Sequence, residues 1–183
     1  MQEAVSTQER WRSRGWRPPR IAVNVSAIQL REAGFVDQVR RILEPVPRDE
    51  RGLDIEITES LLLDNVSGAI EKLNEIRSMG VEVAIDDFGT GYSSLAYLNK
   101  LPIHLLKIDR SFVTGLVNEA ESSSIISAII ALARGLRLKV VAEGVETEEQ
   151  ARLLHLLRCD QLQGFLTGAP MCREELERTF FSA

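Results

Sequence analysis

The strongest constraint on the fold is a regular alternation of short apolar runs with longer segments of helical spacing. The runs are rich in β-branched residues and nearly continuous in apolar character. They occupy Arg20–Val25, Leu53–Ile57, Val81–Ile85, Leu105–Ile108, Lys139–Ala142 and Gln161–Phe165. Continuous apolar strands that alternate with helices are typical of a parallel sheet covered by helices. The sequence therefore predicts an α/β fold with about six parallel strands.

The segments between the runs carry apolar residues at intervals of three and four, as an amphipathic helix does. This spacing predicts helices over Val66–Met79, Ser122–Leu136, Glu148–Leu157 and Arg173–Phe181. The stretch Pro45–Gly52 is rich in proline and charge, which favours a surface loop. No Gly/Ser-rich linker divides the chain, so its 183 residues are expected to form a single domain.

Composition excludes several classes of protein. A net charge of −5 and a pI near 5.2 argue against a general nucleic-acid binder, so DNA is not an expected partner. The two cysteines cannot form a disulfide framework, which favours a reducing cytosol. The longest apolar stretch, Ile125–Ala133, is too short to span a bilayer. A cytoplasmic domain is expected, and a membrane anchor on a longer parent chain is compatible with it.

Polar side chains gather where the predicted strands end. These residues are Asn24, Ser26, Glu56, Thr58, Glu59, Asp86, Asp87, Lys107, Asp109, Glu143, Glu146 and Gln163. The carboxyl ends of parallel strands meet at one rim, where α/β folds place their active sites. Solvation of strand ends explains any one of these residues, but it explains the whole set poorly. The pattern predicts a single polar site at this rim.

Oxygen donors dominate this predicted site. Crowded carboxylates repel one another unless cations neutralise them. Oxygen-only ligands favour Mg²⁺ or Mn²⁺, and two such ions suit phosphoryl transfer. The adjacent pair Asp86 and Asp87 can serve two ions, and Lys107 can hold a water nucleophile or stabilise a charged transition state.

The segment Asp86–Ser94, DDFGTGYSS, directly follows the third predicted strand. Its glycines allow a tight turn and a close approach of backbone N–H groups to a ligand. Taken alone, the segment would be a plain βα turn. After an Asp–Asp pair it is interpreted as a mobile substrate loop. The loop residues are Phe88, Gly89, Thr90, Gly91, Tyr92 and Ser93.

Six motifs in a consistent order resemble those of the EAL domain, the family of cyclic di-GMP phosphodiesterases of bacterial signalling. They are NVS at Asn24–Ser26, EITE at Glu56–Glu59, DDFGTGYSS, KID at Lys107–Asp109, EGVE at Glu143–Glu146 and QGFLTGAP at Gln163–Pro170. The resemblance runs from about Trp11 to Phe181. It implies a TIM-type (β/α)₈ barrel that hydrolyses cyclic di-GMP to linear pGpG with Mg²⁺ or Mn²⁺.

The resemblance also implies roles for single residues. Asn24, Glu56 and Asp86 resemble ligands of the first metal ion, whereas Asp86 and Asp87 resemble ligands of the second. Lys107 resembles the lysine that holds the attacking water.

Four further residues acquire roles by the same resemblance. Glu143 resembles a carboxylate that binds the second metal ion or acts as general base. Glu146 and Gln163 resemble groups that order water and substrate. Glu59 resembles the glutamate that pins the Asp86–Ser94 loop and couples the site to dimerisation.

One departure from the family is plain, because the sequence contains no Glu-Ala-Leu tripeptide. Residues 1–16 resemble the helix that precedes the NVS strand, and residues 20–183 resemble the barrel repeats. The chain is therefore expected to be a partial domain, without the first strand, its metal-binding glutamate and the first helix. Weak metal binding and slow or absent turnover follow from that expectation.

Two exposed sheet edges would favour a homodimer or another association, and a sensory or GGDEF domain is expected upstream in a longer parent.

Three other functions are compatible with parts of the pattern. The chain can be a receptor that binds cyclic di-GMP without cleaving it, or an interaction module that binds no nucleotide. Carboxylates and a lysine at strand ends also suit metal-assisted enolisation in barrel enzymes. The retained metal-ligand set favours the phosphodiesterase over the receptor, and the DDFGTGYSS and EGVE motifs disfavour enolisation.

Overall fold

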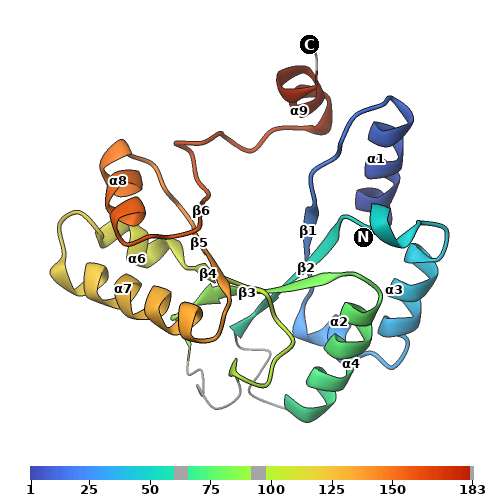
Figure 1. Cartoon of the computed structure of the whole chain (residues 1–183), viewed down its shortest axis with the longest axis horizontal. Helices are drawn as coiled ribbons and strands as arrows, with labels where there is room; N and C mark the ends of the chain where they lie inside the picture. The colour runs from blue at the N-terminus through green and yellow to red at the C-terminus, as the bar shows by residue number, and fades with distance from the viewer. Residues whose placement is uncertain (60–65, 92–97, 182–183) are drawn as a thin grey trace.

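The computed structural model describes residues 1–59, 66–91 and 98–181. The elements in chain order are α1 Gln2–Ser13, β1 Ile21–Asn24, α2 Ala27–Arg31, α3 Phe35–Leu43, the 3₁₀ helix η1 Arg48–Glu50, β2 Leu53–Thr58, α4 Val66–Ser78, β3 Glu82–Phe88, β4 Leu105–Ile108, α6 Arg110–Gly115, α7 Ala120–Gly135, β5 Lys139–Ala142, α8 Glu148–Leu156, β6 Gln161–Leu162 and α9 Arg173–Phe180. The strands lie at the centre of the molecule and the helices lie around them (Figure 1).

The six strands form one sheet in the order β1-β2-β3-β4-β5-β6, and each neighbouring pair is parallel. Each crossover therefore returns to the adjacent strand, which brings all six carboxyl ends to one rim. The sheet curves as an incomplete barrel, and the predicted α/β class with six parallel strands is confirmed (Figure 1).

The two faces of the sheet differ in polarity, as β2 shows. Leu53, Ile55 and Ile57 are fully buried on the face that the helices cover, whereas Asp54 and Glu56 alternate with them and are only half-buried. The helix-covered face holds the main hydrophobic core. The other, concave face carries the charged residues of the strands, so alternation along each strand separates the core from the polar hollow.

A small apolar layer interrupts the polar concave face. Ala84, Leu105 and Val141 from three neighbouring strands form a separate cluster. This layer lies between charged residues at the start of the strands, such as Glu82, and those near their ends, such as Lys107.

Some elements differ from the predictions in extent. Strand β3 continues to Phe88 through an irregularity in its pairing, so the Asp pair belongs to the strand itself. Strand β6 ends at Leu162 rather than Phe165. The predicted loop Pro45–Gly52 contains the one-turn helix η1.

Three helices, α2, α3 and α6, were not predicted. α2 and α6 have five and six residues, too few to display a helical repeat of apolar residues. Their caps start them instead: the Ser26 side chain accepts a hydrogen bond from the Gln29 N–H, and Asp109 accepts one from the Ser111 N–H.

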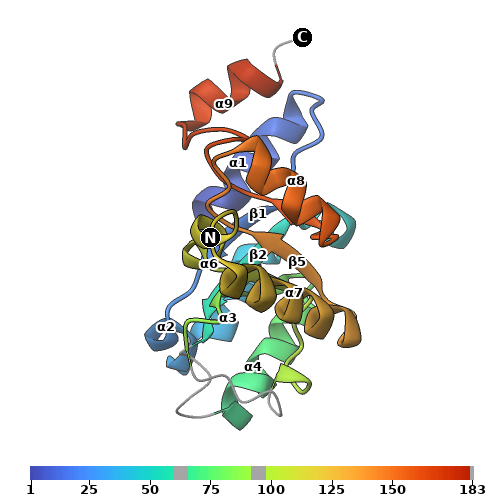
Figure 2. The ribbon, with the colours of Figure 1, turned by 90° about the vertical axis from the view of Figure 1, so that its left-hand side faces the viewer.

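The two ends of the described chain meet. Helices α1 and α9 lie side by side (Figure 2). The Trp16 and Phe181 rings stack with centroids 4.7 Å apart, and the Trp11 indole N–H donates to Glu177 at 2.9 Å. Among the helices that the structure describes, none is long and apolar enough to cross a lipid bilayer.

Candidate active site

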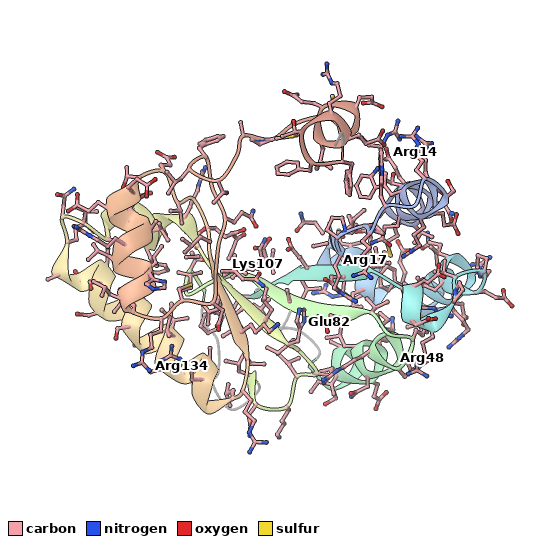
Figure 3. The ribbon with its side chains drawn as sticks, turned by 45° about the horizontal axis from the view of Figure 1, so that its top comes forward. Arg14, Arg17, Arg48, Glu82, Lys107 and Arg134 are labelled. Atoms are coloured by element: carbon pink, nitrogen blue, oxygen red, sulfur yellow. The ribbon has the colours of Figure 1, made fainter. Side chains whose placement is uncertain are left out.

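Lys107 lies at the centre of the polar rim. It projects from β4 to the concave side of the sheet, and only 5% of its surface is exposed (Figure 3). Its Nζ atom lies 2.8 Å from Glu56, 2.9 Å from Asp86 and 2.7 Å from Glu143. These carboxylates come from β2, β3 and the end of β5, so parallel pairing alone brings together residues far apart in sequence.

The charges at Lys107 do not balance. Burial opposes the ammonium charge, yet hydrogen bonds with the surrounding carboxylates raise the pKa of Lys107 above its usual range. Burial raises the pKa of Glu143, and the negative charges of Asp86 and Glu56 add to that effect against the attraction of Lys107. Three carboxylates around one ammonium leave an excess of negative charge, which a bound cation would neutralise.

The backbone of β3 explains how two adjacent aspartates serve one site. Successive side chains of a regular strand point to opposite faces. Here the register shifts between Ile85 and Phe88, and Asp87 adopts a left-handed φ of 53°. Through this bulge, Asp86 and Asp87 each place a carboxylate oxygen within 4.8 Å of the other and of one from Glu143.

The donor chemistry of this group fits a divalent cation. All three residues offer hard oxygen ligands, the kind that Mg²⁺ and Mn²⁺ prefer. The Oδ1 atom of Asp86 is buried, and its one short polar contact among the described residues is the ion pair with Lys107 at 2.9 Å. Burial raises the pKa of Asp87, and the charges of Asp86 and Asp109 raise it further. A cation would relieve this repulsion.

Asn24 and Glu56 are neighbours in the sheet. They are paired in the parallel register of β1 and β2, at the carboxyl ends of both strands. On the other side of β2, Thr58 is paired with Asp86. The predicted ligands therefore follow one another along the rim in strand order.

Glu59 holds the start of the predicted substrate loop. It is 5% exposed, and its Oε2 accepts hydrogen bonds from the backbone N–H groups of Gly89 at 3.0 Å and Gly91 at 3.4 Å. Gly89 has a φ of +102°, and a Cβ there would lie 2.9 Å from the ring of Phe112. A side chain at this position would be strained as well as crowded.

Other members of the loop are placed as follows. Phe88 is buried, and the Thr90 hydroxyl donates to the Asp87 carbonyl at 2.9 Å. Tyr92 and Ser93, also predicted for this loop, lie outside the described residues.

Gln163 borders two hollows. The first, of about 450 Å³, is lined by Glu56, Lys107 and Gln163 among others. The second, of about 370 Å³, is lined by Gln163, Glu146 and Phe165, and Phe165 is 65% exposed at its edge. Glu146 thus lies in the hollow beside the Lys107 cluster rather than within the cluster.

Asp109 belongs to the predicted polar strand ends, but its sequence pattern predicts no role of its own. Its charge contributes to the raised pKa of Asp87, and hydrogen bonds from Ser111 lower the pKa of Asp109 against the opposing effect of burial. Its position two residues after Lys107, at the end of β4, was the available signal. The same pattern of polar strand ends that identified the other residues therefore covers Asp109.

Comparison with known protein families agrees with this arrangement. The model of the EAL domain matches residues 1–170. This chain belongs to the EAL domain family. The match includes all the strands and every predicted site residue.

Curated relatives are longer signalling proteins of bacteria. The chain is 46% identical over 176 residues to MucR of Pseudomonas aeruginosa, named a bifunctional diguanylate cyclase/cyclic di-GMP phosphodiesterase. This alignment covers 96% of the chain and 26% of MucR. The chain is also 46% identical over 158 residues to the cyclic di-GMP phosphodiesterase NbdA of the same species. That alignment covers 86% of the chain and 20% of NbdA. The EAL chain thus spans about a quarter or less of the length of these relatives.

Solved structures confirm the fold. The MucR phosphodiesterase in complex with c-di-GMP superposes with a TM-score of 0.86 at 46% identity, over 96% of this chain and 71% of that one. The EAL domain of Mycobacterium smegmatis DcpA gives a TM-score of 0.91 at 40% identity, over 99% of this chain and 82% of that one. The six-stranded sheet is therefore an incomplete barrel of the EAL type.

Proposed function

We propose that this EAL domain hydrolyses cyclic di-GMP to linear pGpG. The observation that carries the proposal is the Lys107 cluster beside the Asp86–Asp87 bulge. The MucR structure with c-di-GMP, at 46% identity, supports this choice of substrate. The reaction adds the oxygen of water to one phosphorus of the cyclic dinucleotide and breaks one P–O bond, and the released sugar oxygen takes up a proton.

The proposed cofactor is Mg²⁺ or Mn²⁺, two ions in a complete site. Asn24, Glu56, Asp86, Asp87 and Glu143 would hold them. When bound, these ions supply Lewis-acid activation of water and neutralise the phosphate charge. Their positive charge also lets an acidic protein accept an anionic dinucleotide.

The residues of the chain have the following roles in this proposal. Lys107 orients the attacking water and stabilises the negative charge that develops on the phosphoryl oxygens. Glu143, 2.7 Å from the Lys107 ammonium, binds the second ion or takes the proton of that water as general base. Gln163 and Glu146 line the second hollow, where they order water and substrate. Glu59 pins the Gly89–Gly91 turn and couples the site to dimerisation.

A receptor that binds cyclic di-GMP without cleaving it is the second candidate. It is favoured by the position of Lys107, whose ammonium group lies within 2.9 Å of all three carboxylates and so balances part of their charge.

Calorimetry with cyclic di-GMP and Mn²⁺, combined with chromatography of released pGpG, tests the proposal. We expect Mn²⁺-dependent binding and a slow release of pGpG, which Lys107→Met abolishes. The matched control is Lys72→Met, because Lys72 also contacts three oxygens, the carbonyls of Leu30, Arg31 and Glu32, but outside the site. Binding without any pGpG would select the receptor, and no binding would contradict both functions.

The wider organisation is also proposed. Residues 1–183 act as one domain, with the helix within residues 1–16 and the barrel repeats within 20–183. The domain works in the cytoplasm, as a homodimer, within a longer signalling chain that carries a sensory or GGDEF domain. The name of MucR, which combines a cyclase with a phosphodiesterase, supports such a parent. Light scattering at micromolar concentration tests the dimer, and a single monomer mass would contradict it.

A further inference from the structure

The loop from Glu143 to Thr147 joins β5 to α8 and carries two of the predicted site residues. Neighbouring strands hold its first half, because the Glu143 N–H donates to the Ile108 carbonyl at 3.1 Å and the Val145 N–H to the Gln163 carbonyl at 3.0 Å. One side chain holds its second half. The Gln150 Oε1 atom accepts hydrogen bonds from the N–H groups of Glu146 at 2.8 Å and Thr147 at 3.0 Å.

Gln150 also reaches a second element. Its Nε2 atom donates to the Val113 carbonyl of α6 at 3.1 Å, in a buried contact, and Gln150 is only 7% exposed. Helix α6 begins directly after Asp109, at the end of β4. One amide group therefore joins the β5–α8 loop to the helix that follows the strand of Lys107.

Close packing holds the same loop on both sides. Gly144 has a φ of +69°, and a Cβ there would lie 2.6 Å from the Cβ of Arg110 on α6. On the other side, a Cβ on Gly164 would lie 2.2 Å from the Val145 carbonyl oxygen. The loop thus touches α6 and the residues after β6 at backbone distance, so a shift of its backbone would displace Glu143 and Glu146.

We infer that Gln150 is a positioning residue of the active site. Its amide sets the backbone of residues 143–147 against α6, so that Glu143 reaches Lys107 and Glu146 reaches the second hollow. Gln150 acts through these two residues and does not itself contact the proposed substrate. The inference deepens the proposed function and rests on it for the metal-binding readout alone.

Two substitutions separate the two ends of the Gln150 amide. Gln150→Met removes both the acceptor and the donor at similar size. Gln150→Glu keeps an acceptor for the two N–H groups but cannot donate to the Val113 carbonyl when ionised. Gln29→Met is the matched control, because Gln29 closes the equivalent cap of α2 with Ser26 and is exposed.

Amide hydrogen exchange followed by NMR is the primary measurement. In Gln150→Met we expect the amides of Glu146 and Thr147 to exchange at least about tenfold faster, while core strand amides keep their rates. Gln150→Glu should restore much of that protection. Gln29→Met should speed up hydrogen exchange at the Ser26 amide. It should leave exchange at the amides of residues 146 and 147 at the wild-type rate. Calorimetry should show Mn²⁺ affinity about three- to tenfold lower in Gln150→Met, since Glu143 keeps its bond to Ile108 but loses the support of the loop that follows it.

Two results would overturn the positioning role. One is unchanged exchange at residues 146 and 147 in Gln150→Met. The other is an equal acceleration of all core amides, which would mark a general loss of stability. If the wild-type chain takes up neither Mn²⁺ nor cyclic di-GMP, the proposed function fails, and the exchange rates still decide the role of Gln150.

Discussion

At the scale of single residues, charge and burial are in conflict at the rim. The charges of Lys107 and of the three carboxylates around it compensate each other in part. This lets the ammonium group be buried and lets the carboxylates lie close together. The pKa of Glu143 is raised in the folded chain, mainly by burial. Its ionised form therefore destabilises the fold, which makes a pH test of the site possible.

The pH dependence of unfolding should differ between the wild type and Glu143→Gln in the absence of metal. A raised folded-state pKa means that the folded chain binds the proton more tightly than the unfolded chain. As pH falls from 7 through the raised pKa of Glu143, the wild type should gain stability relative to the variant, whose side chain is always neutral. Urea unfolding between pH 7 and 4.5 with a chelator measures the difference. Parallel stability curves would contradict the assignment.

Asp86 and Asp87 show what the sequence could and could not predict at this scale. Their residue type and their place after an apolar run predicted two metal ligands. The bulge that brings both carboxylates near Glu143 depends on the left-handed Asp87 and on pairing with β4. Such a register shift has no periodic signature in the sequence, because it arises where two strands meet.

At the scale of elements, the turn after β3 depends on Gly89. Replacing Gly89 with alanine should lower the free energy of unfolding by about 1–2 kcal/mol, since the left-handed backbone disfavours a Cβ and the Phe112 ring crowds it. Gly168→Ala is the control, because a Cβ there meets no described atom within 4 Å.

Urea unfolding of both glycine variants gives the comparison. Equal stability of Gly89→Ala and Gly168→Ala would show that the turn adapts freely. The turn should also lose its hydrogen bonds to Glu59 in Gly89→Ala, which faster amide exchange at Gly91 would report.

Long elements were predictable and short ones were not. The apolar spacing of residues 66–79 and 122–136 matches α4 and α7 within two residues at each end, because each helix buries a continuous stripe. Helix α3 also has such a stripe, with Phe35, Val36 and Val39 buried, but it is only nine residues long. By contrast, α2 and α6 depend on a single cap each.

At the scale of the whole molecule, the first and last helices hold each other. Helix α9 buries none of its own residues, and the contacts at this end of the molecule run through Glu177 of the helix and the ring of Phe181, which directly follows it. Phe181→Ala should therefore lower the free energy of unfolding by about 0.5–1.5 kcal/mol through the loss of its ring contacts. It should also shift the fluorescence of Trp11 and Trp16, the chain's two tryptophans.

Phe180→Ala serves as the matched control for this contact. Phe180 is the preceding residue and is 67% exposed. Its removal should leave both fluorescence and stability close to the wild type. An equal effect of the two substitutions would show that the α1–α9 contact contributes little to stability.

The sequence by itself determined the class of fold and the chemistry of the rim. Apolar runs, helical spacing and residue type are local properties, and they are sufficient to predict parallel strands with carboxylates and a lysine at their ends. Tertiary structure alone decided which of these groups meet. Lys107 contacts Glu56, 51 positions away, because strands β2, β3 and β4 lie side by side in register, and Glu146 lies in a separate hollow because Gln150 ties its loop to α6. Distances between strand ends depend on sheet curvature and on pairing across the whole chain, which no local pattern encodes.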